Sequence, residues 1–258
     1  MPAASSLLEI ARVAGTNVAW MPTDGALHGP IVDRLMFWNL VALCASALVA
    51  HLWLAGAMLR RHPASRNFPI MIRWSLIVVF CVMYTWMALT AQQLWAANRY
   101  AGPSLTAMHV EVVGEQFQWY FRYPGADAVF GITRPQLVDA AAGNPLGLDP
   151  RDPHSADDVV SSTLVLPAGR EVDLQLRSLD VIHGFFIPGM RIKQNTVPGL
   201  VLHIHFTPIV AGTYPILCSQ VCGLGHARMQ ARLEVVSPAD YQAWLATRER
   251  ARMGGSAK

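Results

Sequence analysis

The sequence predicts a two-helix transmembrane hairpin followed by an all-β domain. Its 258 residues are 53% hydrophobic and only 14% charged, which is too apolar for an ordinary soluble protein. Two long apolar runs in the first hundred residues can each cross a bilayer core of about 30 Å. Beyond Pro103 the pattern changes to short alternating runs broken by glycine and proline, which is typical of strands. So many short strands predict a sandwich or a Greek-key barrel.

The first two of four predicted segments are residues 1–35 and 36–97. The first is an external segment with a short amphipathic helix and a loop, and its apolar patch is not placed as in a cleavable signal peptide. The second is the hairpin, with apolar runs 36–58 and 74–95. The sequence between these runs carries four arginines: Arg60, Arg61, Arg66 and Arg73. Because positive connections stay in the cytoplasm, we expect a multi-pass inner-membrane protein with both ends on the periplasmic or external side.

The last two segments are the β domain, residues 98–236, and a C-terminal helix and tail, residues 237–258. Seven strands are expected, near residues 108–113, 116–123, 162–166, 171–176, 181–187, 200–206 and 232–236. The stretch from about 125 to 160 is rich in proline and turn formers and is predicted to be a surface loop. Ser237 as N-cap and Pro238 at the first helical position favour the final helix.

The most specific chemical signal is a C-x3-C-x3-H-x2-M run formed by Cys218, Cys222, His226 and Met229. Thiolates, imidazole and thioether are soft or borderline ligands, and they select copper or zinc over magnesium or calcium. Methionine beside cysteine and histidine favours copper, since structural zinc sites use cysteine and histidine. The run therefore predicts a copper redox site. A disulfide between the two cysteines is the alternative, but it gives no reason for His226 and Met229.

A second cysteine is more than a mononuclear copper centre needs. Two thiolates can bridge two copper ions if a further histidine comes from elsewhere in the fold, and His183 in the apolar strand 181–187 is the candidate. That strand would lie beside the loop if both belong to one β-sandwich. A buried core histidine is the alternative interpretation of His183, and only the neighbouring motif favours a ligand.

These two stretches, with residues 191–199 between them, resemble subunit II of cytochrome c oxidase. The resemblance implies a cupredoxin-like barrel with a dinuclear copper centre, CuA. Its ligands would be Cys218, Cys222, His183, His226, Met229 and the backbone carbonyl of Gln220. The implied function is electron transfer in a terminal respiratory oxidase, from cytochrome c to haem in subunit I, where oxygen is reduced. The implied partners are subunit I, other oxidase subunits, cytochrome c and the membrane; nothing in the sequence indicates nucleic acid.

The aromatic segment 114–125 resembles the part of the family that receives electrons from cytochrome c. Phe117 stands where many members have tryptophan, so the candidates for electron entry are Phe117 itself and, as substitutes, Trp119 and Tyr120. The alternative is a strand whose aromatics pack the barrel. Asp180 matches an acid that helps to dock cytochrome c in the family. Asp157 and Asp158 either extend that acidic patch or are solvated loop residues, whereas His203 and His205 are predicted to be exposed strand residues that only mimic a metal pair.

Gln220 replaces a glutamate whose side chain, in the family, binds magnesium or manganese at the subunit I interface. A neutral amide is a weaker ligand for such a hard cation than a carboxylate. The glutamate at the mouth of a proton channel has no counterpart, because residues 34–110 contain neither aspartate nor glutamate.

Two rival functions are a copper-free quinol oxidase subunit, which the intact ligand set disfavours, and a copper-transfer protein, which would need an exchangeable site. The absence of C-x-x-C-H predicts that the donor is a separate or partner-borne cytochrome.

Overall fold

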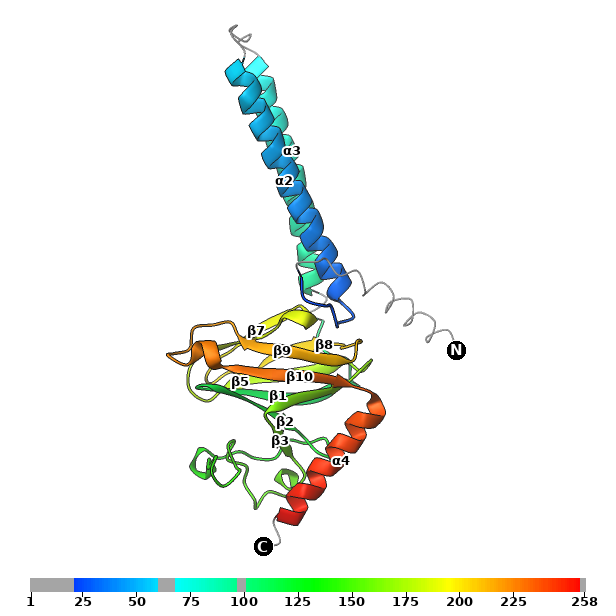
Figure 1. The fold of residues 1–258 in the computed structure, drawn as a ribbon, viewed down its shortest axis with the longest axis vertical. Helices are drawn as coiled ribbons and strands as arrows, with labels where there is room; N and C mark the ends of the chain where they lie inside the picture. Colours follow the sequence, from blue (N-terminus) through cyan, green and yellow to red (C-terminus); the bar gives the residue numbers. More distant parts are fainter. Residues whose placement is uncertain (1–20, 60–67, 97–100, 256–258) are drawn as a thin grey trace, which may run out of the picture. The chain divides into compact units, whose positions relative to one another are not determined.

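The structure, a computed structural model, describes residues 21–59, 68–96 and 101–255 (Figure 1). The chain divides into two compact units, a helical hairpin made by residues 30–101 and a β unit made by the remaining residues. The predicted N-terminal amphipathic helix and three of the four arginines of the connection lie outside the described residues. The four-segment division of the chain stays a prediction.

The hairpin consists of α2 (Gly29–Leu59) and α3 (Phe68–Trp95), both long and apolar enough to cross a membrane. Helix α2 begins before the predicted start at residue 36, because its first turns continue through polar residues that precede the apolar run. Ser46 of α2 donates a hydrogen bond to the Met83 sulfur of α3 at 3.8 Å. Large apolar side chains are exposed along both helices, including Leu43 at 66% and Val82 at 65%. Such surfaces fit contact with lipid or with other membrane helices.

The β unit consists of two five-stranded sheets. The first has the order β3-β2-β1-β5-β8 and the second the order β4-β10-β9-β6-β7. Apolar side chains from both sheets form one buried core, as expected when alternate residues of each strand face inward. The strands are β1 (Met108–Glu115), β2 (Gln118–Tyr123), β3 (Val159–Ser161), β4 (Thr163–Pro167), β5 (Val172–Ser178), β6 (His183–Ile187), β7 (Ile192–Thr196), β8 (Leu202–Phe206), β9 (Gly212–Cys218) and β10 (Gln230–Val236).

Three of these strands, β3, β7 and β9, were not predicted. Strand β3 is short, and β7 is a largely polar strand at the edge of its sheet, so neither has a strong apolar alternation. Strand β9 contains Pro215, which demotes a strand prediction because proline cannot donate to a ladder. Pro215 is paired with Arg232 of β10, whereas β6 pairs only with the other end of β9, at Leu217 and Cys218. The missing N–H therefore falls where β6 does not need it.

Helix α4 (Pro238–Gly255) follows the last strand and packs on the β unit. The Ser237 side chain accepts a hydrogen bond from the backbone N–H of Asp240 at 3.1 Å, which satisfies one free donor of the first turn. Tyr241 is buried, and the ring centroids of Trp244 and Tyr123 are 4.9 Å apart. The apolar stripe of α4 thus continues the core beyond the barrel.

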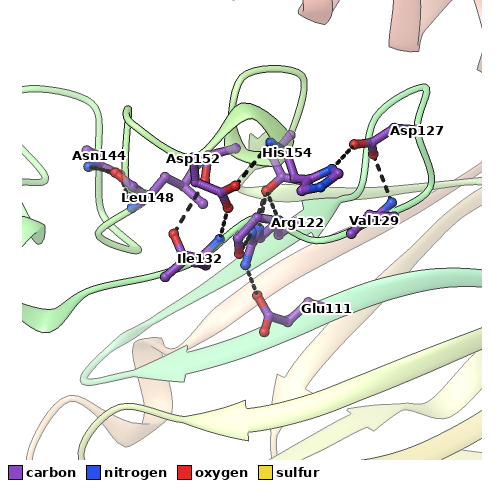
Figure 2. A network of polar contacts seen from close by, with 12 residues as sticks. Glu111, Arg122, Asp127, Val129, Ile132, Asn144, Leu148, Asp152 and His154 are labelled. Atoms are coloured by element: carbon purple, nitrogen blue, oxygen red, sulfur yellow. Dashed lines mark hydrogen bonds and ion pairs between the residues drawn. The ribbon is translucent and has the colours of Figure 1, made fainter.

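The long loop between β2 and β3 is tied to the sheet by a buried polar network, shown in Figure 2. Its centre is Arg122 of β2, whose side chain is 2% exposed. The guanidinium donates to Asp158 and to the carbonyl oxygen of Gly131, both in the loop, and to Glu111 of β1 at 3.3 Å. Asp158 is fully buried. The segment is a surface loop, as its composition predicts, but its base is fixed by buried charge.

Candidate metal site

Two strand ends and one loop bring the predicted metal ligands together. His183 is the first residue of β6 and Cys218 the last residue of β9. The two strands are antiparallel neighbours with Phe185 opposite Cys218, and the pairing places His183 at the edge where β9 ends. The backbone N–H of Ser219 then donates to the Gly184 carbonyl oxygen at 2.8 Å, which holds the start of the loop against β6.

The ligand atoms of His183, Cys218 and Cys222 all lie within 4.8 Å of one another. Both cysteines are free and their sulfurs are 3.8 Å apart, so this structure does not contain the alternative disulfide between them. The Cys222 sulfur lies 3.7 Å from Nδ1 of His226 and 3.8 Å from the sulfur of Met229. The Cys218 sulfur lies 3.2 Å from the Gln220 carbonyl oxygen. All six residues predicted as ligands therefore gather around the two sulfurs.

The two nitrogens of His183 have different surroundings. Nε2 is 2.8 Å from a carboxylate oxygen of Asp180, whereas Nδ1 is buried and has no hydrogen-bond partner among the described residues. A buried polar atom without a partner is destabilising, and a bound metal would satisfy it. The carboxylate on the other nitrogen fixes the ring and leaves Nδ1 as the ligand, an arrangement common at metal-binding histidines. The residues present therefore fit a copper ion.

The protonation state of Cys222 makes metal binding at this site depend on pH. Burial, together with the neighbouring Cys218, raises the pKa of Cys222 to about 11. Without metal this thiol stays protonated at neutral pH. Since thiolates are the metal-binding form, metal binding must release protons here.

Comparison with known proteins identifies the family. The family model for the cytochrome c oxidase subunit II periplasmic domain matches residues 108–236, which include every residue of this cluster. The chain belongs to the cytochrome c oxidase subunit II family. The β unit is accordingly a cupredoxin-like fold, and membership of the subunit II family implies copper at the cluster. The two apolar helices joined to this periplasmic domain indicate a membrane protein.

Relatives share different lengths of the chain. The alternative cytochrome c oxidase subunit 2 of Bradyrhizobium diazoefficiens is 39% identical over 160 residues, 61% of this chain and 57% of that protein. The probable cytochrome c oxidase subunit 2 of Streptomyces coelicolor is 30% identical over 253 residues, 87% of this chain and 77% of that protein. The solved periplasmic domain of Bradyrhizobium japonicum subunit II is 22% identical and covers 58% of this chain and 99% of that domain, with a TM-score of 0.44. The match to the first of these relatives thus spans less than two thirds of that protein.

The subunit II aromatic segment is arranged differently from the sequence prediction. Trp119 is 1% exposed, so it does not lie on the surface over the loop of residues 218–229, here called the copper loop. It points into the barrel, where its ring is T-shaped to those of His183 and Phe185, with ring centroids 5.8 and 5.2 Å away. Tyr120, the next residue of β2, is also buried, in a separate cluster with Val113. Trp119 therefore follows the alternative interpretation, in which strand aromatics pack the barrel, whereas Tyr120 packs on the opposite face of its strand.

Phe117 is the aromatic residue that meets the copper loop. It lies in the turn before β2 and is 38% exposed. Its ring packs over the glycines of the loop so closely that a Cβ on Gly225 would lie 2.3 Å from Cδ2 of Phe117. The close approach requires glycine at this position. Of the three aromatic residues predicted for electron entry, Phe117 is thus the exposed one, and it lies over the copper loop.

Asp180 and Gln116 connect His183 of β6 to the loop that carries Cys222. One Asp180 oxygen contacts His183, and the other accepts the backbone N–H of Gln116 at 2.7 Å. The side-chain amide of Gln116 donates to the Cys222 carbonyl oxygen at 2.5 Å. Burial would raise the pKa of Asp180, but hydrogen bonds from His183 and from backbone N–H groups hold it below its usual value. Docking of cytochrome c at Asp180 stays a prediction. The sequence analysis did not identify Gln116 as a site residue, and its position just before the aromatic run is the only feature of the sequence that points to it.

Two other predicted groups, the loop aspartates and the strand histidines, agree only in part with their expectation. Asp158 is fully buried against Arg122, so it is neither a solvated loop residue nor part of a surface patch. Asp157 is partly buried and accepts from the backbone N–H groups of Ala126 and Asp127. His203 is exposed on its strand, as predicted, and His205 is partly buried.

Proposed function

We propose that this chain is the electron-transfer subunit of a terminal respiratory oxidase, accepting electrons from a c-type cytochrome at a dinuclear copper centre and passing them to haem in subunit I. The convergence of two free thiols with His183, His226 and Met229 carries this proposal. Two thiolates side by side can bridge two ions, which a mononuclear centre would not require. Oxygen reduction belongs to subunit I.

In this proposal the thiolates of Cys218 and Cys222 would hold the copper together with His183, His226, Met229 and the carbonyl of Gln220. When bound, the copper supplies reversible one-electron chemistry. The chain keeps water away from most of the ligands, since His183 and Met229 are fully buried and Cys222 is 5% exposed. The strand ends and the bonds of Asp180 and Gln116 hold the ligands in place, so little rearrangement accompanies a change of charge.

Electron acceptance is assigned to the exposed edge of Phe117 above the loop glycines, with the donor cytochrome seated on this face. The partners are subunit I, other oxidase subunits and the cytochrome, and the copper domain lies on the periplasmic side of the inner membrane. Gln220 is exposed, and its neutral amide is a weak ligand for a hard cation, so a magnesium or manganese ion at the subunit I interface is not part of this proposal.

The buried ligands also bear on the rival functions. A copper-free quinol oxidase subunit needs none of the clustered residues. A copper-transfer protein needs a site from which the ion can leave, whereas three of the ligand side chains here are almost completely enclosed. Electron transfer is the function that this burial favours.

The experiment is rapid reduction of the assembled oxidase by reduced cytochrome c, followed at the haem of subunit I. Cys222→Ser should abolish the reduction, because a hard hydroxyl cannot replace a soft bridging thiolate. Cys81→Ser, which changes a cysteine of α3, is the matched control and should reduce as the parent does. Equal reduction of parent and Cys222→Ser would contradict the proposal.

A further inference from the structure

Three of the nine histidines surround one aspartate on the outer face of the sheet β3-β2-β1-β5-β8. Asp173 of β5 is paired with His109 of the parallel neighbour β1 and with His205 of the antiparallel neighbour β8. His203 lies two residues before His205 and therefore on the same face. The pairing of three strands thus places one carboxylate among three imidazoles, in the sheet opposite that of β6 and β9.

Two of these histidines contact the carboxylate directly. Nδ1 of His109 lies 3.2 Å from Oδ2 of Asp173, and Nδ1 of His203 lies 2.9 Å from the same oxygen. Asp173 is 1% exposed, whereas the side chains of His109 and His203 are 44% and 50% exposed. The carboxylate is therefore held rigidly beneath two rings that are accessible from solvent.

A buried carboxylate needs a compensating positive charge, because an ionised group without one is strongly destabilising away from water. Arg177, on the same face of β5, pairs with Glu111 at 2.8 Å and does not supply that charge to Asp173. The bonds that the structure gives Asp173 come from the two imidazoles, and an imidazole carries no permanent charge. A cation bound between the rings and the carboxylate would supply the charge.

We propose that His109, Asp173 and His203 form a second metal site, for a divalent ion of the zinc class, with His205 as the fourth ligand. Imidazole and carboxylate suit zinc, whereas magnesium and calcium prefer oxygen ligands alone. In a tetrahedral site with bonds of about 2.0 to 2.1 Å, neighbouring ligand atoms are about 3.3 Å apart. The two nitrogen–oxygen distances of 2.9 and 3.2 Å are close to that spacing.

Closing the site requires the rings to turn. Among the described residues, only the His183, Cys218 and Cys222 group already has three ligand atoms within 4.8 Å of one another. The rings of His109 and His203 are about half exposed, so they can rotate toward an ion without displacing the core. Asp173 needs no movement, and its pairing in the sheet fixes the position of the site.

The test is zinc binding to the full-length chain in detergent, with any affinity tag removed. Cys218 and Cys222 are first changed to serine, so that the soft ligands of the copper site do not take up zinc and the result does not depend on the proposed copper function. Calorimetric titration with Zn²⁺ should show one ion per chain. Asp173→Asn and His203→Gln should each weaken binding at least about tenfold, in the range of losses known from altered metal sites.

His154→Gln is the matched control, because His154 also contacts an aspartate, Asp127, at 2.6 Å, but on an exposed loop. It should bind zinc as the parent does. The proposal would be overturned if the chain with both cysteines replaced bound no zinc, or if adding Asp173→Asn to it left the zinc affinity unchanged. A second measurement uses the unmodified chain and does not depend on any variant folding. Zn²⁺ should protect His109 and His203, but not His154, from diethyl pyrocarbonate, and equal labelling of all three with and without zinc would also overturn it.

Discussion

Replacing Asp180 separates two roles for this residue, orientation of a copper ligand and docking of cytochrome c. The carboxylate contacts Nε2 of His183 at 2.8 Å and accepts the backbone N–H of Gln116 at 2.7 Å. In Asp180→Ala both interactions disappear, and the His183 ring is free to turn Nδ1 away from the thiols. In Asp180→Asn the amide oxygen can still accept one of these two hydrogen bonds. The amide NH2 group then stands opposite the other donor and cannot accept its hydrogen bond.

The expected magnitude follows from the role of such partners at metal sites. Loss of a residue that orients a metal-binding histidine lowers metal affinity by about 10- to 100-fold. This corresponds to about 1.4 to 2.7 kcal/mol of binding free energy. We expect the full loss for Asp180→Ala and a smaller loss for Asp180→Asn, because the amide keeps part of the bonding.

The assay is competition for copper between a chelator of known affinity and the full-length chain in detergent. Asp127→Ala is the matched control, since Asp127 also contacts a histidine, His154, but none of the predicted ligands. It should retain the parent affinity. If Asp180→Ala holds copper as tightly as the parent, and only its reduction by cytochrome c slows at low salt, Asp180 is a docking residue and the reasoning from His183 is refuted.

Three further predictions concern electron acceptance, the loop network and topology. Phe117→Leu should slow reduction by cytochrome c, measured by stopped flow, and leave the optical spectrum of the copper unchanged. Trp119→Leu should alter that spectrum, because Trp119 packs on His183. The opposite pattern would contradict the assignment of electron acceptance to Phe117. Asp158→Asn should lower the free energy of unfolding by about 1.5 to 3 kcal/mol in denaturant titrations, because Arg122 loses its charged hydrogen bonds to Asp158 and keeps only Glu111 as a counter-charge. A change near zero would argue against the network. Protease added to intact spheroplasts should remove the copper domain; digestion only after the membrane is opened would reverse the topology.

The sequence predicts best where the chemistry is local. Cys218, Cys222, His226 and Met229 lie within one short loop, so their spacing alone brings them together. His183 is remote in sequence, and its place depends on the pairing of β6 with β9. Strand β9 itself was not predicted, because Pro215 interrupts its pattern. The family resemblance therefore predicts the full ligand set, whereas the periodicity of the strands does not.

The errors have a common physical origin in strand register. Phe117 and Trp119 are two residues apart and would share a face in a continuous strand, but β2 begins at Gln118 and Phe117 lies in the turn. Trp119 consequently faces the core while Phe117 is exposed over the loop. The burial of Asp158 depends on Arg122 reaching it from a neighbouring strand, and no local pattern shows that contact. Contacts between strands are the part of the site that a single sequence does not contain.

The central claim is that two bridging thiolates hold two copper ions that share one unpaired electron. The most direct test is electron paramagnetic resonance with spin quantitation on the copper-loaded full-length chain, beside a chemical determination of bound copper. The account predicts two copper ions and one unpaired spin per chain, with the shared-electron signal lost in Cys218→Ser and in Cys222→Ser. One copper ion per chain, carrying one spin in a mononuclear signal, would contradict it.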